Sequence, residues 1–248
     1  MKLLQLNVWQ NRLHKQVLDL IAKEQPDILC LQEICSSNYV PPLFPGFAGF
    51  EAIQAALPDY ESHFAPCFSS PLFGSTCSFG NAIFSRFPLA DTEIIFINGQ
   101  YQEGVELFDR NTTNIRNLQR TAVKTPEGEF CLINHHAFWV PNEMGSQESV
   151  EKMQRTADVI KSSPRPLVFS GDLNVVSKSP AMKSIHALLR DLTEEYNIPT
   201  TLSGFGKVPN VPCDHICVSE GIQIQKFGAK QDIVSDHLAL TLEFGLEV

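Results

Sequence analysis

The stretch Leu-Val-Phe-Ser-Gly-Asp-Leu-Asn, residues 167–174, carries the most information about the fold. Its apolar start is too short for a helix and lies between Pro166 and Gly171, so it predicts a buried strand over Pro166–Ser170. Asp172 and Asn174 follow the strand directly. Residues of these types bind metals, but they are also common in turns and caps.

Apolar runs that end in a polar residue recur along the rest of the chain. Many are rich in β-branched residues and bounded by Gly, Pro, Asn or Ser, which predicts strands. The other predicted strands are Leu3–Val8, Asp27–Gln32, Asn81–Ser85, Ile94–Asn98, Thr121–Lys124, Phe130–His136, His215–Val218, Ile222–Phe227 and Leu238–Phe244. Helical spacing is confined to Leu13–Ile21, to Val150–Ile160 with a start near Ser146, and to Ala181–Leu189. Many strands with few helices indicate packed sheets with helices outside.

Length and patterning predict one domain over residues 1–248. Large β-containing folds of this length are routinely single domains, and no repeat or linker interrupts the chain. The segment Val40–Phe79, rich in Phe and Pro, is expected to be a long connection with at most one short helix. Such connections form either binding elements or packed structural excursions.

The charge balance disfavours a protein that coats nucleic acid. There are 19 Lys and Arg against 28 Asp and Glu, a formal net charge of −9, whereas nucleic-acid-binding domains usually carry clustered basic residues. The seven cysteines are odd in number and scattered, which is typical of a reducing compartment. The chain shows no signal peptide and no apolar stretch long enough to span a membrane. We therefore expect a soluble, cytoplasmic protein; its oligomeric state is not readable from sequence.

Polar residues at the predicted strand ends form a candidate site. Strand ends at one edge of a sheet converge in space, so these residues are expected to share a cleft. They are Asn7, Glu33, Asn134, His135, His136, Asp172, Asn174, Asp236 and His237. Taken singly, each is as readily a turn, cap, surface or core residue. As a set, carboxylate, amide and imidazole groups suit Mg²⁺ or Mn²⁺ and phosphate-ester hydrolysis.

Other catalytic patterns fit the sequence poorly. Cys213 and Cys217 would lie about 13 Å apart on a strand, too far for one zinc ion. Strand alternation places Cys213, His215 and Cys217 on one face and leaves Asp214 to face a site. The chain has no Gly-x-Ser-x-Gly turn and no glycine-rich nucleotide-binding loop. Cys77 is a poor candidate nucleophile because free cysteines are usually buried as small apolar residues.

The motifs, taken in order, have a recognisable pattern. They are Leu-Gln-Leu-Asn (4–7), Pro-Asp-Ile-Leu-Cys-Leu-Gln-Glu (26–33), Gly-Asn-Ala-Ile-Phe-Ser-Arg-Phe-Pro-Leu (80–89), Ile-Asn-His-His (133–136), Ser-Gly-Asp-Leu-Asn (170–174), Asp-His-Ile (214–216) and Ser-Asp-His (235–237). This series resembles the endonuclease/exonuclease/phosphatase superfamily, which includes deoxyribonuclease-like, abasic-site, sphingomyelinase and inositol-phosphatase enzymes. The resemblance implies an α/β four-layer sandwich of two packed mixed β-sheets flanked by helices.

The resemblance also implies roles for individual residues. Glu33, with Asn7 and Asp236, would hold the divalent metal. Asp172, positioned with Asn174, would orient or deprotonate the attacking water. His237, held by Asp214, would contact the scissile phosphate or serve as the base, and His136, chosen over His135 by the Asn-x-His spacing, would support the phosphate or the leaving oxygen. A carboxylate on the second ring nitrogen fixes a histidine's tautomer and stabilises its charged form.

Substrate choice must come from the loops, because diesterases and monoesterases would share this core. Arg120 directly precedes a predicted strand, as a family arginine often does, and is the candidate phosphate ligand; Arg110 and Arg116 are more readily solvated surface residues. The acidic charge favours a small or lipid-like phosphate ester. The alternatives are an endo- or exonuclease and a non-catalytic binding module on the same fold, although a binding module would have no physical need for the full set of metal, His and Asp positions.

Overall fold

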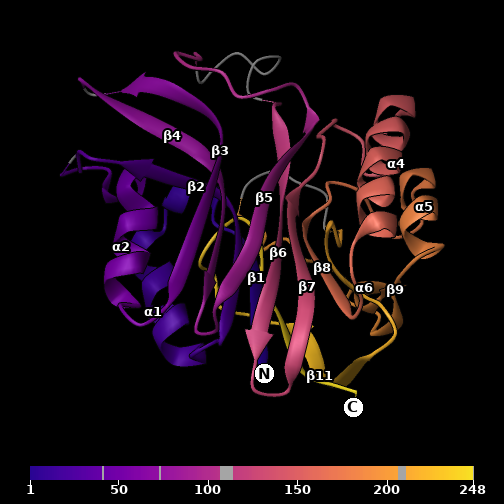
Figure 1. The fold of residues 1–248 in the computed structure, drawn as a ribbon. Helices are drawn as coiled ribbons and strands as arrows, with labels where there is room; N and C mark the ends of the chain where they lie inside the picture. Colours follow the sequence, from indigo (N-terminus) through magenta and orange to yellow (C-terminus); the bar gives the residue numbers. More distant parts are fainter. Residues whose placement is uncertain (41, 73, 107–113, 206–210, 248) are drawn as a thin grey trace.

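The computed structural model describes every residue except 41, 73, 107–113, 206–210 and 248 (Figure 1). One six-stranded sheet has the order β11-β12-β1-β2-β4-β3, made of Ile222–Ala229, Leu240–Leu246, Lys2–Asn7, Ile28–Ser37, Ser75–Ser85 and Glu61–Leu72. The other has the order β5-β6-β7-β8-β10-β9, made of Leu89–Asn98, Arg116–Thr125, Gly128–His136, Leu167–Asp172, Asp214–Val218 and Arg190–Asp191. Each of the ten predicted strands corresponds to one of these elements.

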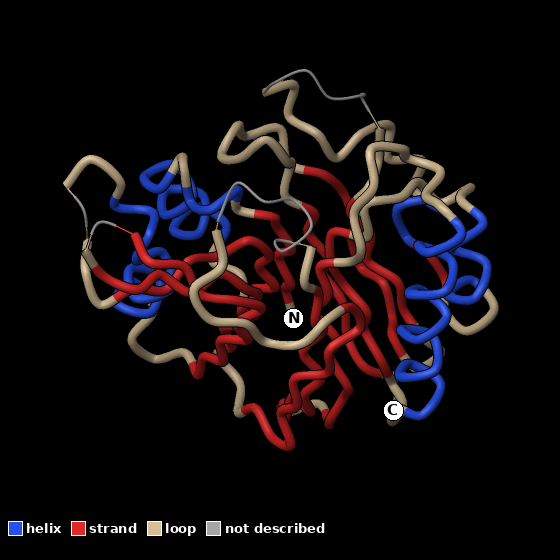
Figure 2. Tube along the Cα trace, turned by 90° about the horizontal axis from the view of Figure 1, so that it is seen from above, coloured by secondary structure: helices blue, strands red, loops and turns tan. Residues whose placement is uncertain are grey.

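Helices cover the outer face of each sheet (Figures 1 and 2). The α-helices of the described residues are α1 (His14–Glu24), α2 (Gly49–Ala56), α4 (Gln147–Ser162), α5 (Lys183–His186) and α6 (Leu192–Glu195), and the 3-10 turns are η1 (Trp9–Asn11), η2 (Pro45–Ala48) and η3 (Pro180–Met182). Helix α4 begins where the sequence predicts, because Ser146 and Ser149 form a reciprocal capping box. The predicted segment Ala181–Leu189 is realised only as η3 and the single turn of α5.

Three apolar clusters hold the four layers together. Between the sheets, Leu3 and Ile28 of the first sheet belong to one buried cluster with Leu132, Val168 and Ile216 of the second. A second cluster joins α1 and α2 to the first sheet, and a third joins α4 and α5 to the second. The predicted sandwich of two mixed sheets with helices outside is therefore confirmed.

The prediction for Val40–Phe79 is wrong. This segment contains η2, α2, the whole of β3 and the start of β4. Strand β3 was missed because Pro66 and Pro71 interrupt its pattern, and prolines are tolerated here because β3 lies at the edge of its sheet.

Pairs of parallel strands place the candidate residues at one end of the sandwich. Asn7 at the end of β1 is level with Gln32 on β2, and His136 at the end of β7 is level with Asp172 at the end of β8. The two chain termini lie at the opposite end (Figure 1). In the described part of the chain, no helix has both the length and the apolar character needed to span a bilayer.

Candidate active site

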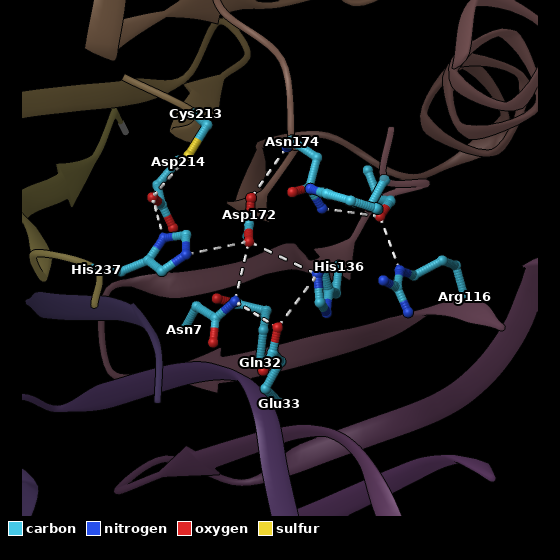
Figure 3. A network of polar contacts seen from close by, with 12 residues as sticks. Asn7, Gln32, Glu33, Arg116, His136, Asp172, Asn174, Cys213, Asp214 and His237 are labelled. Atoms are coloured by element: carbon cyan, nitrogen blue, oxygen red, sulfur yellow. Dashed lines mark hydrogen bonds and ion pairs between the residues drawn. The ribbon is translucent and has the colours of Figure 1, made fainter. Parts of the chain in front are cut away.

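Polar side chains from both sheets meet where β1, β7 and β8 end and where β2 has a bulge (Figure 3). The first sheet supplies Asn7 and Glu33, the second supplies His136 and Asp172, and His237 comes from the segment before β12. A cleft of about 460 Å³ is lined by several of these side chains, including Glu33, Asp172 and His237. The structure thus brings together residues that are up to 230 positions apart in sequence.

A bulge in β2 directs Glu33 into the site. The pairing of β2 with β4 shifts between Leu31 and Ile34, and Glu33 has a φ of 53°. Regular alternation would point Glu33 toward the helix layer, since Gln32 faces the other sheet. The left-handed conformation, which costs a non-glycine residue on the order of 1 kcal/mol, instead brings its Oε1 to 3.2 Å from the Asn7 amide nitrogen.

Asp172 lies at the centre of the cluster. Its Oδ2 accepts a hydrogen bond from Asn7 Nδ2 at 3.0 Å and lies 3.6 Å from His136 Nε2 and 3.7 Å from His237 Nε2. Its Oδ1 accepts a hydrogen bond from the backbone N–H of Asn174 at 3.0 Å. Burial, aided by the nearby charge of Asp214, raises the pKa of Asp172 to about 7. A carboxyl group with this pKa can exchange a proton at neutral pH.

Asn174 supports this carboxylate from the loop after β8. Its φ of 56° is a left-handed conformation that asparagine tolerates better than most residues. Its side-chain Nδ2 donates to the carbonyl of Ala137 at 3.1 Å, which ties the loop after β8 to the end of β7.

His237 is held by Asp214. The His237 Nδ1 lies 2.8 Å from Asp214 Oδ2, while Gln5 Nε2 donates to the other oxygen, Oδ1, at 2.8 Å. Burial lowers the pKa of His237, but the charges of Asp214 and Asp172 outweigh burial and raise it well above its ordinary value. Burial likewise raises the pKa of Asp214, and the charge of His237 outweighs it and lowers the pKa. The pair is therefore an imidazolium next to a carboxylate, with Nε2 of His237 directed toward Asp172.

His136 differs from His237 in its charge. Burial, with smaller contributions from the charges of Arg116 and neighbouring histidines, lowers the pKa of His136 well below its ordinary value. The ring is therefore neutral at pH 7, and its Nε2 lies 4.0 Å from Glu33 Oε1. The site contains one neutral and one charged imidazole on either side of the same carboxylate.

Glu33 and Asp236, next to Asn7, fit a hard divalent cation. The two carboxylates offer oxygen atoms and line the same cleft. Asn7 lies beside Glu33, with its Nδ2 facing Glu33 and its Oδ1 accepting a hydrogen bond from the backbone N–H of Trp9 at 2.9 Å. Burial first, and then the negative charge of Glu33, raises the pKa of Asp236. An unfavourable concentration of negative charge of this kind is what a bound cation offsets.

A second group of ligand-type atoms does not suit a metal as well. Atoms of Asp172, Cys213, Asp214 and His237 lie within 4.8 Å of one another. However, His237 and Asp214 are hydrogen-bonded to each other. In addition, burial raises the pKa of Cys213 to about 12, so its thiol keeps its proton. We interpret this group as a hydrogen-bonded cluster.

The predicted alternation is correct for the residues of β10 but wrong for Cys213, which precedes the strand and lies beside Asp214 at the cleft instead of on the face of His215 and Cys217. Ile216 and Val218 pack between the sheets, whereas Cys217 packs on the helix side. His215 is fully buried; its Nδ1 lies 2.9 Å from Asp191 Oδ2 and its Nε2 lies 2.9 Å from the carbonyl of Val175. His215 therefore has a structural place away from the site.

Below the site, the two sheets are joined by a chain of buried amide side chains, of which only Asn134 was a candidate residue from the sequence. Gln5 Nε2 donates to Gln32 Oε1, Gln32 Nε2 donates to Asn134 Oδ1, and Asn134 Nδ2 donates to Gln119 Oε1, at 2.6–2.9 Å. Gln119 in turn contacts His63. The signal was present for Gln5 and Gln32, which are polar residues within apolar runs, but not for Gln119, which lies on the mostly polar strand β6. Through Gln5, the amide chain ends on Asp214.

Arg116, and not Arg120, reaches the cleft. Arg120 pairs with Glu93 and contacts Ser163, and it lines a different pocket. Strand β6 was predicted to begin at Thr121 but begins at Arg116. The arginine at the site end of β6 is therefore Arg116, and Arg120 lies about 13 Å farther along the strand. Arg116 donates to the carbonyl of Ala137 at 2.9 Å and lines the cleft with Glu33 and His136. Arg110 lies outside the described residues.

Known proteins resemble this chain in sequence pattern and in fold. Residues 4–237 match the model of the Endonuclease/Exonuclease/phosphatase family. No curated protein matches the chain. Several solved structures share the fold at low identity, and three of them illustrate the range.

An endonuclease/exonuclease/phosphatase from Beutenbergia cavernae is 17% identical, with a TM-score of 0.75 over 99% of this chain and 71% of that one. The mannosyl-6-phosphatase of Bacteroides thetaiotaomicron is 17% identical, with a TM-score of 0.72 over 98% and 99% of the two chains. The catalytic domain of human Nocturnin, solved with a bound sulfate anion, is 20% identical, with a TM-score of 0.70 over 100% and 93%. At these identities the likeness shows the fold alone.

Proposed function

Because the chain belongs to the endonuclease/exonuclease/phosphatase family, we propose that it is a divalent-metal-dependent hydrolase that cleaves a phosphate ester by attack of water. One observation carries the proposal: the Asp172 carboxylate lies 3.6 Å from the neutral His136 and 3.7 Å from the charged His237. Acid and base groups of different protonation state thereby face one small space.

Asp172 is the base in this proposal. A base is most effective when its pKa is near the working pH, and burial raises the pKa of Asp172 to about 7. The hydrogen bonds from Asn7 and Asn174 fix the direction of the carboxylate, so that it can orient a water and take its proton. His237 is the weaker candidate base because its raised pKa keeps it protonated.

His237 and Arg116 would then bind the phosphate. His237 directs a charged N–H into the cleft while Asp214 holds the other ring nitrogen. Arg116 adds a second cation in the same cleft, and His136 would lie near the phosphate or the leaving oxygen. The positive charges of His237 and Arg116 would offset the negative charge that develops on the phosphoryl oxygens.

Enzymes of this family use divalent metals, and Glu33, Asp236 and Asn7 would hold the ion, which we propose is Mg²⁺ or Mn²⁺. When bound, such an ion polarises a phosphoryl oxygen as a Lewis acid. The substrate would be a small or lipid-like ester, since the net charge of −9 provides little attraction for a long polyanion. The seven buried free cysteines suit the cytoplasm.

The test is an assay of the purified protein on phosphomonoesters, phosphodiesters and single-stranded oligonucleotides with Mg²⁺, Mn²⁺ or EDTA. We expect hydrolysis that requires the metal, and a loss of at least about 100-fold in kcat for Glu33→Gln and for His237→Ala. Glu129→Gln, an exposed residue at the other end of β7, is the control for the glutamate change.

Activity that survives EDTA, or that is unchanged in both variants, would show that the proposed mechanism is wrong. A strong preference for oligonucleotides would instead make the protein a nuclease with the same chemistry. Metal binding without hydrolysis of any ester would favour a binding module.

A further inference from the structure

A second pocket opens beside the catalytic cluster. Its volume is about 370 Å³, and its walls include Phe47, Cys67, Phe68 and Phe79. We call this the aromatic pocket. Glu33, Arg116 and His136 line both the aromatic pocket and the catalytic cleft, so the two spaces adjoin at these side chains.

The walls of the aromatic pocket are held in place by their own packing. A bulge in β3 between Pro66 and Phe68 puts Phe68 opposite Phe79, and their rings stack at 5.1 Å with an angle of 17° between planes. Phe47 meets Phe79 edge to face at 6.3 Å. Because Phe68 and Phe79 are each at most 7% exposed, binding of a ligand would not have to order them first.

The size and lining of the aromatic pocket suit one planar ring system. A closed apolar cavity of about 150 Å³ is enough to bind benzene, so the aromatic pocket has room for a ring and its linking atoms. Pockets of about 300 Å³ or more with apolar walls and a few polar groups are typical small-molecule sites. A wall that includes three phenylalanines favours an aromatic ring over a flexible chain.

The charges lie where a phosphate ester of such a ring needs them. Arg116 is half-buried at the junction of the two spaces, and Arg12 lines the aromatic pocket with its guanidinium 4.6 Å from the ring of Trp9. A phosphate between Asp172 and Arg116 would be a few bonds away from a ring in the aromatic pocket.

We propose that the substrate is a phosphate ester of a planar aromatic group, and that the aromatic pocket binds this group while the phosphate lies in the catalytic cleft. This inference rests on the proposed function and narrows its substrate class. Of the small and lipid-like esters considered above, it selects small esters that carry an aryl or heteroaryl group.

The test measures binding of phosphonates, whose P–C bond is not hydrolysed. Methyl-, cyclohexyl- and phenylphosphonate, and the phosphonate analogue of adenosine monophosphate, are titrated into the intact protein with Mg²⁺. Tryptophan fluorescence is a suitable readout. Both tryptophans of the chain, Trp9 and Trp139, line a third pocket, which shares Glu33 and Arg116 with the aromatic pocket and the catalytic cleft. We expect phenylphosphonate to bind about ten-fold or more tightly than methylphosphonate, and more tightly than cyclohexylphosphonate, because a buried planar ring gains stacking as well as apolar contact.

Variants assign the effect to the aromatic pocket. Phe79→Leu should reduce the preference for phenyl over methyl to less than about three-fold. Phe130→Leu, the same change at a buried phenylalanine between the sheets, should leave it unchanged. Cys67→Met fills the aromatic pocket without removing a ring. It should weaken the binding of phenylphosphonate and leave the binding of methylphosphonate unchanged, and it replaces Phe79→Leu in the test if that variant does not fold.

The outcomes separate the two proposals. Equal binding of methyl- and phenylphosphonate, or of phenyl- and cyclohexylphosphonate, would overturn the aromatic substrate and leave phosphate binding intact. Failure of every phosphonate to bind, together with absence of metal-dependent hydrolysis, would overturn the proposed function and this inference with it. Tighter binding of phenylphosphonate or of the nucleotide analogue supports the inference and tells an aryl from a nucleobase substrate.

Discussion

Replacing Asp172 with asparagine should make the metal-free protein more stable while abolishing its activity. The Asp172 side chain is buried between two histidines, and its pKa is raised from 3.8 to about 7 by burial and by the charge of Asp214. An acid whose pKa is higher in the folded state binds its proton more tightly there than in the unfolded chain. Stability therefore falls as the pH rises from 3.8 to about 7.

The expected gain follows from this difference. Three pKa units at about 1.36 kcal/mol each give roughly 4 kcal/mol of destabilisation above pH 7. Asparagine at position 172 removes this destabilisation because it carries no charge. It has only one side-chain oxygen for the two donors, Asn7 Nδ2 and the Asn174 N–H, so one hydrogen bond is lost at a cost of about 1–2 kcal/mol. The net gain is about 2–3 kcal/mol, or a rise in Tm of roughly 5–10 °C.

The assay is thermal and urea unfolding of wild type and Asp172→Asn in EDTA from pH 4 to pH 8. The difference between them should be small or reversed at pH 4 and should grow to its full value by pH 8. Asp59→Asn, the same change at an exposed residue, is the control. If Asp172→Asn were less stable than wild type at pH 8, or if the difference did not change with pH, the reasoning about Asp172 would be refuted.

Three other predictions test separate parts of the structure. Gln5→Leu should lower kcat about ten-fold with little change in KM, because it removes a hydrogen bond that positions the carboxylate behind the catalytic histidine, and steady-state kinetics check this. Asp191→Asn should lower the free energy of unfolding in urea by about 3–5 kcal/mol. Burial opposes the charged forms of Asp191 and His215, but their pairing outweighs burial, lowering the pKa of Asp191 and raising that of His215. The loss should therefore be largest between pH 3.8 and 6.5, where both groups are charged in the folded and unfolded states. Arg116→Lys should lower kcat/KM at least ten-fold whereas Arg120→Lys should not, and equal effects would contradict the placement of Arg116 in the site.

Much of the fold was predictable because its strands carry strong local patterns. Leu3–Val8 and Pro166–Ser170 are short apolar runs with clear boundaries, and the strands that they form, β1 and β8, end in Asn7 and Asp172 at the same edge of the sandwich. Strand β3 (Glu61–Leu72) was not predictable in this way, because its stability comes from pairing with β4 and from an edge position that a single sequence does not reveal.

The site was predictable in composition more than in geometry. Asp172 and His237 could be proposed from their motifs, but the direction of Glu33 depends on a bulge whose left-handed residue has no local signal in the sequence. The choice of Arg116 over Arg120 depended on where β6 begins, and strand boundaries are the least certain part of a pattern-based prediction. The aromatic pocket depended on tertiary packing of Phe47 against β4, which no spacing rule gives.

The chain of buried amides from Gln119 to Gln5 has a consequence for how this sequence can change over time. Gln32 and Asn134 each donate to one neighbour and accept from another, and the hydrogen bond between them joins the two sheets, so replacing either one leaves a buried group without a partner and is costly. A change is tolerated only if the adjoining member changes with it. We therefore expect Gln5, Gln32, Asn134 and Gln119 to vary as one block among related proteins, even though none of them is proposed to touch the substrate.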